Sequence, residues 1–373
     1  MTAKQDSQAS PPSHHNINSN YPRTPKEPPL PYSTPPPPHS AIHNIFVGPE
    51  GLRPGWGLLI YLALLAALII GGTIIGQKTH LIAPTPTPAE RAHSPAVPIT
   101  PAVPITPAKL FVPESIQFLA VLFVTFLMSR IERRPQSTYG LGGSHKLKQF
   151  LSGLAWGALF LSLLVLLLRQ LGLVVVDARL LFGLDALHHA AIWLLGFLLV
   201  GLLEEYFTRG YLQYTLARAL TGLYQLAFKT RHSPTLGFWT AAIFISILFG
   251  LGHSGNPGES PIGLLSAGLA GLVFCLSLWR TGSLWWAIGF HASWDWAQSF
   301  LYGVGDSGTL ISSHFLSSHP QGAPILSGGA TGPEGSIYVV PILALTAIII
   351  VLTLPAGSLP DPAAAPSSAA PHH

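Results

Sequence analysis

The chain has 373 residues, of which 49% are hydrophobic and only 9% are charged, and its mean hydropathy is +0.44. Soluble domains usually carry about 25% charged residues, so this composition excludes an ordinary soluble protein and indicates an integral membrane protein. The formal net charge of +4 is small and the basic residues are scattered, so we expect no nucleic-acid partner. Cys275 is the single cysteine, which excludes an internal disulfide and a cysteine-based metal cluster.

The two ends of the chain differ in composition from its middle. Residues 1–50 are rich in Pro, Ser, Asn and His without apolar periodicity, which predicts a disordered tail. A membrane domain is expected at 51–355, followed by a second disordered tail at 356–373. Within the membrane domain, a Pro/Thr-rich stretch at 77–109 repeats Ala-Val-Pro-Ile-Thr-Pro, which favours an extended linker.

The apolar segments predict an all-α fold, a polytopic membrane helix bundle with about eight transmembrane helices. The predicted spans are 56–75, 114–128, 150–171, 187–209, 238–253, 262–279, 284–300 and 338–354. Gly153 and Gly157 are spaced for a close helix contact, and small residues at 263, 267 and 271 predict another packing face.

Lysine and arginine residues in short loops predict the orientation, because cytoplasmic loops carry an excess of them. With eight spans, the basic loops all fall on one side of the membrane. Their basic residues are Arg130, Arg133, Arg134, Lys146, Lys148, Arg218, Lys229, Arg231 and Arg280. We therefore expect an integral protein of a bacterial plasma membrane with both termini in the cytoplasm.

The stretch at 202–209 is unusual, because two adjacent carboxylates and an arginine stand at the end of an apolar span. Charged side chains at membrane depth cost at least about 2.5 kcal/mol each by insertion scales, and they usually mark function. Glu205 and Arg209 are four residues apart, so they share a helix face and can form a buried pair. Glu204 is turned by about 100° from Glu205 and has no obvious local cation. We therefore predict a supporting role for Glu205 and Arg209 and a chemical role for Glu204.

Further polar residues lie on later spans. His253 follows Phe249 by four residues, so the two rings should pack together, and His291 and Asp295 share one helix face. A carboxylate with a histidine can activate water, and a second polar pair can stabilise the oxyanion formed when water attacks an amide. No serine or cysteine nucleophile has a suitable setting in the spans. These residues predict a peptidase without a covalent intermediate, with Glu204, His253, His291 and Asp295 as the catalytic set.

Other interpretations of these residues stay open. Polar groups in spans can simply hold helices together. The same four residues could bind zinc through nitrogen and oxygen, although no HExxH motif is present. Intramembrane charges also line ion paths, although the sequence shows no inverted repeat that would favour a transporter.

The span boundaries set two of these residues apart. Glu204 lies late in its span and His253 late in the next, so antiparallel helices would place them at opposite membrane faces. The segment 211–220 is apolar enough to continue the first of these helices. Glu204 would then lie near the middle of a longer helix, which would relieve the conflict.

The three motifs Glu204-Glu205-xxx-Arg209, Phe249-xxx-His253 and His291-xxx-Asp295 together resemble the signature of the CPBP intramembrane proteases. The resemblance covers about residues 130–305. This family includes the CAAX prenyl endopeptidases and the bacteriocin-immunity-like Abi proteins. The resemblance implies a helical membrane fold and a glutamate-dependent peptidase that uses no metal and no other cofactor.

By the same resemblance, Glu204 and His253 would activate water, while His291 and Asp295 would occupy the oxyanion-site positions. Glu205 and Arg209 would be structural support. The family often has asparagine where this chain has Asp295. Because an ionised aspartate cannot donate a hydrogen bond, Asp295 must either stay protonated or orient His291.

The expected partner is a peptide or membrane-protein substrate in the lipid bilayer, cleaved near the cytoplasmic leaflet. The alternative is a non-catalytic membrane partner, for example in immunity, which the long termini and the aspartate at position 295 motivate.

Overall fold

The computed structural model describes residues 45–48, 51–79, 104–256 and 258–355. The two predicted tails and the predicted linker lie largely or wholly outside these ranges. Contacts divide the chain into Met1–Ser40, which lies outside the described residues, and Ala41–His373, which holds every element described below.

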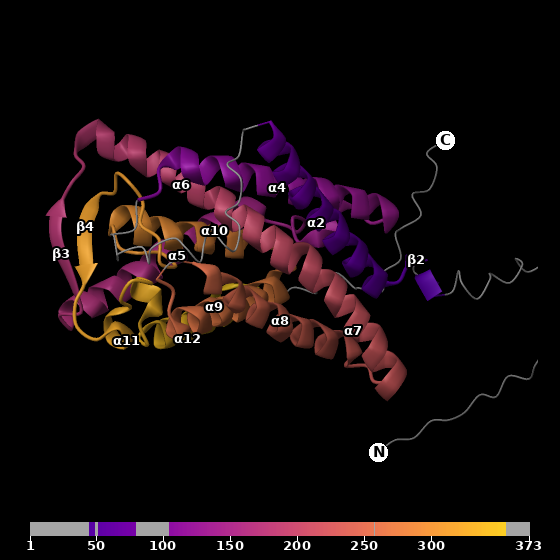
Figure 1. The fold of residues 1–373 in the computed structure, drawn as a ribbon. Coiled ribbons are helices and arrows are strands. Elements are labelled where there is room, and N and C mark those ends of the chain that lie inside the picture. Colours follow the sequence, from indigo (N-terminus) through magenta and orange to yellow (C-terminus); the bar gives the residue numbers. More distant parts are fainter. Residues whose placement is uncertain (1–44, 49–50, 80–103, 257, 356–373) are drawn as a thin grey trace, which may run out of the picture. The chain divides into compact units, whose positions relative to one another are not determined.

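The described residues form mainly helices joined by short connections (Figure 1). The long helices are α2 (Pro54–Lys78), α4 (Pro107–Ile131), α5 (Lys146–Gln170), α6 (Gly183–Glu205), α8 (Ser233–Gly252) and α9 (Pro261–Thr281). A π-helical segment, η2 (Tyr206–Leu212), joins α6 to α7 (Gln213–Phe228) without a break, and a second one, η4 (Ala297–Leu301), extends α10 (Trp285–Trp296). The chain ends in α12 (Val339–Thr353). Single-turn elements are η1 (Gln136–Tyr139), η3 (His253–Gly255), α11 (Pro324–Ser327) and η5 (Pro333–Gly335).

Six of the described helices are long and apolar enough to cross a membrane, counting Gly183–Phe228 as one helix of 46 residues. The prediction of a membrane helix bundle is therefore confirmed. The predicted number of eight spans is not, because α10 has 12 residues and α12 has 15. α4 begins at Pro107, seven residues before the predicted span, because Pro at the first helical position needs no hydrogen-bond partner for its nitrogen.

The ends of α9 show how the sequence sets a helix boundary. The hydroxyl of Ser260 accepts a hydrogen bond from the backbone nitrogen of Gly263 at 3.0 Å, and Pro261 follows at the first helical position. At the other end Gly282 adopts a left-handed conformation with φ 65°, which glycine accommodates without strain. Between these two ends, α9 packs against α8 and α12.

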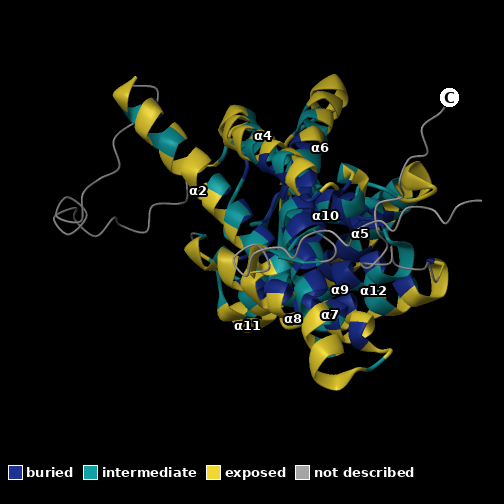
Figure 2. Cartoon of the chain, turned by 90° about the vertical axis from the view of Figure 1, so that its right-hand side faces the viewer, coloured by how far each residue is buried: buried dark blue, intermediate teal, exposed yellow. Residues whose placement is uncertain are grey.

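α10 lies at the centre of the bundle, and most of its residues are buried (Figure 2). α5 packs closely along it, because Gly153 and Gly157 meet backbone atoms of α10 and Gly289 meets backbone atoms of α5. A side chain at any of these glycines would collide with the opposing helix, so the predicted glycine contact is confirmed. The outer helices α2, α4 and α6 carry exposed apolar side chains, as expected for surfaces that face lipid.

Two strands stand at one end of the bundle. β3 (Val174–Arg179) pairs with β4 (Leu316–Pro320) in antiparallel register, with Val175 opposite His319. We call residues 302–338 together with β3 the cap. In Figure 1 the cap lies at the opposite end of the bundle from the α7–α8 turn, which carries Lys229 and Arg231. The remaining strands, β1 (Val47–Gly48) and β2 (Gly51–Leu52), pair just before α2.

Candidate active site

The predicted pair between Glu205 and Arg209 is present. A guanidinium nitrogen of Arg209 lies 2.9 Å from Oε1 of Glu205, and both side chains are fully buried. The arginine belongs to the π-helical segment η2, a form of helix that occurs mostly as single turns and frequently at functional sites. Its guanidinium also stacks over the ring of Phe249, with 4.0 Å between its central carbon and the ring centroid.

Glu205 has a second partner across the bundle. Its Oε1 lies 3.1 Å from Nδ1 of His291, so the carboxylate connects Arg209 with the histidine. The other ring nitrogen, Nε2, is 3.5 Å from Oδ2 of Asp295 and 3.8 Å from Oε2 of Glu204. Three carboxylates around one imidazole favour its doubly protonated form. The structure thus makes Glu205 a support for His291 as well as a partner of Arg209.

Glu204 has a different environment from its neighbour Glu205. Its side chain is 32% exposed, whereas that of Glu205 is 0% exposed. Its Oε2 is buried and accepts no hydrogen bond within the described part of the chain. The two adjacent carboxylates thus differ in exposure, although both approach the ring of His291.

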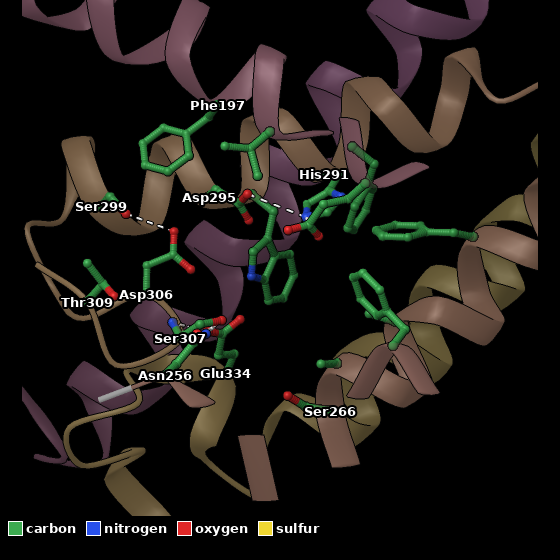
Figure 3. Close-up of a pocket in the computed structure, with 18 of the residues that line it drawn as sticks. Phe197, Asn256, Ser266, His291, Asp295, Ser299, Asp306, Ser307, Thr309 and Glu334 are labelled. Atoms are coloured by element: carbon green, nitrogen blue, oxygen red, sulfur yellow. Dashed lines mark hydrogen bonds and ion pairs between the residues drawn. The ribbon is translucent and has the colours of Figure 1, made fainter. Parts of the chain in front are cut away.

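A cavity of about 240 Å³ lies between the helices and the cap, and we call it the cap cavity (Figure 3). Glu204, His291 and Asp295 line it from the bundle. Asp306, Ser307 and Glu334 line it from the cap, and Ser299 lines it from η4. The cap cavity therefore holds an unusual density of carboxylates.

A second cavity of about 590 Å³ opens between α2, α4, α6 and α8, and we call it the membrane cavity. Most of its lining is apolar, including Leu65, Val121 and Leu248, but Glu204 and His253 reach into it. Because it lies among helices that expose apolar side chains outward, it is suited to a substrate that approaches from lipid.

His253 is held by the end of α8. Its Nδ1 lies 2.8 Å from the carbonyl oxygen of Phe249, and its ring stands edge-on to the Phe249 ring at a centroid distance of 4.9 Å. The predicted contact between these two rings is therefore confirmed. Since a carbonyl can only accept, Nδ1 must carry the proton, which leaves Nε2 as an acceptor in the neutral ring.

The four predicted catalytic residues do not line one cavity. His291 and Asp295 line the cap cavity, and His253 lines the membrane cavity. Glu204 is the only one of the four that lines both. The two cavities share four lining residues, which we call the junction: Glu114, Glu204, Phe249 and Asn256.

The continuous helix Gly183–Phe228 brings Glu204 and the end of α8 together. Glu204 lies near its middle, and α8 packs antiparallel on its second half, α7. His253, at the end of α8, therefore comes level with the middle of the long helix. This arrangement removes the conflict that the shorter predicted span created.

The site lies toward the cap rather than toward the basic loops. Cap residues such as Asp306 and Ile311 line the same cavity as Glu204, while the α7–α8 turn is at the other end of the bundle. If the basic loops are cytoplasmic, this position disagrees with the expectation of a site near the cytoplasmic leaflet. The sequence alone could not give the depth of the site in the membrane, because the depth of Glu204 depends on how far its helix continues.

Three acidic residues at the cavities were not singled out from the sequence. Glu114 stands in an apolar helix, so the same signal that marked Glu204 could have marked it. Asp306 accepts a hydrogen bond from Ser299 Oγ at 2.8 Å, and Glu334 accepts one from the backbone nitrogen of Ser307 at 2.6 Å. Both lie in loops without a regular pattern, so no sequence signal pointed to them.

Burial sets the protonation of the two cap carboxylates. It raises the pKa of the Asp306 carboxyl well above its usual range, and the nearby charges of Asp295 and Glu334 add to the effect. Burial also raises the pKa of Glu334, against the lowering effect of its hydrogen bonds from Ser307. The cap thus favours protonated carboxyl groups next to the ionised centre around His291.

The residues considered for zinc do not form a ligand set in the geometry observed. Among the described residues, no group of three or more His, Cys, Asp or Glu side chains is placed to hold a metal ion. His291 turns its Nδ1 to Glu205, and His253 belongs to the other cavity.

Comparison with known proteins gives one match. Residues 186–297 match the family model described as Type II CAAX prenyl endopeptidase Rce1-like. The matched segment runs from α6 to the start of η4, so it contains the six residues predicted for the site, which are Glu204, Glu205, Arg209, His253, His291 and Asp295. No curated protein and no solved structure matches the chain.

Proposed function

We propose that this chain, a membrane protease of the CAAX prenyl endopeptidase family, hydrolyses a peptide bond with a water molecule activated by Glu204 and His253. The family acts on peptide bonds, and the apolar helices place the chain in a lipid bilayer. The observation that carries the proposed mechanism is the position of Glu204, a partly exposed carboxylate that lines both cavities where they meet.

In this mechanism Glu204 takes a proton from water. The neutral Nε2 of His253 holds the same water from the side of the membrane cavity, because Nδ1 is engaged by the Phe249 carbonyl. A carboxylate and an imidazole acting together typically accelerate such proton transfers by about 10²–10⁴-fold. The water oxygen attacks the peptide carbonyl directly, so no covalent enzyme intermediate forms.

His291 is the candidate donor to the oxyanion. Its Nε2–H faces the cap cavity with only long contacts to Asp295 and Glu204, at 3.5 and 3.8 Å, so it can turn to a developing negative charge. In this mechanism Asp295, which stands where the family often has asparagine, accepts from this group and orients it. Glu205 fixes the opposite nitrogen, and Arg209 fixes Glu205.

The proposed reaction requires no metal. A zinc enzyme built on Glu204, His253, His291 and Asp295 would lose activity in 1,10-phenanthroline and regain it with added zinc. We expect cleavage to persist unchanged in the chelator, which separates the two mechanisms.

For the topology, we propose an integral protein of a bacterial plasma membrane with the basic loops and both termini in the cytoplasm. The cap would then face the other side of the membrane. The substrate would be a peptide segment of a membrane-associated protein that enters from the membrane cavity and reaches the junction.

The test uses the full chain in detergent micelles with two probes, an internally quenched peptide ending in a farnesylated CaaX sequence and quenched fluorescent casein. Glu204→Gln and His253→Ala should each reduce cleavage at least about 100-fold while the protein stays folded. The matched control is Ser115→Ala, a polar residue of α4 that lines neither cavity. Unchanged cleavage in either variant would refute the mechanism. If Glu204→Gln were still to rescue a cellular phenotype of the deleted gene, a non-catalytic partner role would be favoured instead.

A further inference from the structure

The junction contains a carboxylate besides Glu204. This residue, Glu114, stands on a helix outside the segment that matches the family. Glu114 and Glu204 are the two carboxylates of the junction, so both face both cavities. α4, which carries Glu114, packs directly on α6, which carries Glu204.

Glu114 has no structural task that explains it. Within the described residues, its carboxyl group makes no hydrogen bond and no ion pair, in contrast with Glu132, Glu205 and Glu334. It is half-buried and stands in an apolar 25-residue helix, next to Pro113, where a solvent-facing glutamate has no obvious reason to be. A carboxyl group that lines the site without a partner of its own is free to exchange a proton with a bound substrate.

The charged surroundings of Glu114 make it the more suitable proton donor of the pair. Oε2 of Glu204 lies 3.8 Å from Nε2 of His291, which is the one basic side chain among the described residues that line the cap cavity. The other titratable groups around the two cavities are His253 on the α8 side, Asp295 on α10, and Asp306 and Glu334 on the cap. Glu204, with a histidine beside it, is therefore assigned the role of base, and Glu114, with no cation beside it among the described residues, the role of acid.

We propose that Glu114 is the general acid of the reaction, which gives its proton to the leaving amine while Glu204 receives one from water. This inference rests on the peptidase activity proposed above and names a residue that the family motifs do not contain. The water oxygen forms its bond to the carbonyl carbon as Glu204 takes a proton. The carbon–nitrogen bond then breaks, its electron pair stays on nitrogen, and the nitrogen takes the proton of Glu114.

The cycle closes between the two glutamates. After bond cleavage Glu204 is protonated and Glu114 is ionised, so passage of one proton from Glu204 to Glu114 restores the starting state. The net change is addition of one water across the peptide bond. A pair of carboxyl groups with opposite protonation states is a recurring solution for acid–base catalysis at one site.

The experiment compares two bonds in one peptide sequence. The bond cleaved in the farnesylated CaaX peptide is first located by mass spectrometry, and a second peptide is made with an ester in place of that amide. An amine is a far poorer leaving group than an alkoxide, so only amide cleavage depends strongly on the general acid. Glu114→Gln should slow amide cleavage about 100-fold and ester cleavage much less, whereas Glu204→Gln should slow both about equally.

Two further variants separate catalysis from structure. Glu114→Asp, which keeps a proton donor, should recover part of the amide activity that Glu114→Gln loses. Ser115→Ala on the same helix, which lines neither cavity, should change the cleavage of neither substrate. Equal losses on amide and ester in Glu114→Gln, or no loss on either, would overturn the role of Glu114. If Glu204→Gln is inactive in the same assays, the proposed function survives that outcome; if it is active, the proposed function itself has failed.

Discussion

Two glutamates inside this bundle, Glu132 and Glu204, show how surroundings divide buried charges by role. Glu132 is only 6% exposed. Its Oε1 accepts a hydrogen bond from Tyr211 at 2.6 Å, and its Oε2 accepts from Arg218 at 3.2 Å and from Tyr139 at 3.4 Å. Both carboxylate oxygens thus accept hydrogen bonds from the protein itself, and Glu132 lines neither of the two cavities described above.

Glu204 has the opposite surroundings. It lines both cavities, and one of its oxygens is buried without a hydrogen bond among the described residues. An unsatisfied buried acceptor costs about 1–3 kcal/mol, so it persists where a substrate or water is meant to bind. The comparison teaches that a charged side chain in a membrane bundle indicates function when it is open to a cavity and structure when it is fully bonded.

The largest expected effect follows from Glu132→Ala. This change leaves Arg218 buried without its carboxylate and removes the acceptor of two tyrosine hydroxyls. We expect the free energy of unfolding in detergent to fall by roughly 5 kcal/mol, with turnover per folded molecule unchanged. Loss of turnover without loss of stability would contradict the structural role of Glu132.

Glu205→Gln tests a residue that forms a buried ion pair with Arg209 and also contacts His291 of the candidate site. The substitution keeps the size of the side chain but removes the charge that Arg209 and His291 share. We expect a loss of about 3 kcal/mol in unfolding free energy together with slower cleavage, because His291 is no longer fixed. Arg209→Met should match its stability loss; a stable and fully active Glu205→Gln protein would show that the pair has no role.

Glu205 and Glu132 also show how much could be predicted from the sequence. The Glu205–Arg209 pair follows from a spacing of four residues on one helix, and the packing of Phe249 on His253 follows from the same rule. The Glu132 cluster could not be predicted, because two of its three partners, Tyr211 and Arg218, are 79 and 86 residues away along the chain. Nothing in the composition of Tyr206–Leu212 distinguishes a π-helical segment from an α-helix. The sequence allowed the continuation into one 46-residue helix but did not require it.

The proximity of the candidate site residues could also be predicted only in part from the sequence. Motif spacing placed Glu204, His291 and Asp295 on helices, and the structure brings these three together. The spacing of motifs in the sequence could not show that His253 faces a different cavity, nor that the cap supplies Asp306 and Glu334. Loop residues that meet only through tertiary packing leave no periodic trace in a sequence.

A smaller effect is expected from pH, through the buried cap carboxyl of Asp306. Because its pKa is raised, the folded protein holds this proton more tightly than the unfolded chain does. The resulting stability is complete below the ordinary aspartate pKa of about 3.9 and is lost as the pH rises toward the folded value. The thermal midpoint in detergent should therefore fall as the pH increases from about 4 to 9.

Asp306→Asn removes this titration and should flatten the dependence of the midpoint on pH. Ser299 Oγ can still donate to the new amide oxygen, so the fold should persist. An identical slope in wild type and variant would show that Asp306 ionises normally in the folded protein.

The smallest effect is expected at the exposed edge of the cap. His319 Nδ1 lies 2.9 Å from Asp177 Oδ2 between β4 and β3, but the side chains are 54% and 41% exposed. Water and salt screen such pairs, so Asp177→Asn should change the unfolding free energy by less than about 1 kcal/mol and should leave cleavage intact. A large loss of cleavage would instead extend the functional region to the outer strand of the cap.

The contrast between the two glutamates is tested most directly by measuring turnover and unfolding together for Glu204→Gln, with Glu132→Ala beside it in the same detergent and with the same quenched peptide. We predict that Glu204→Gln unfolds at the wild-type midpoint and cleaves nothing, while Glu132→Ala unfolds earlier and cleaves normally as long as it is folded. A Glu204→Gln protein that still cleaves at the wild-type rate would contradict the account.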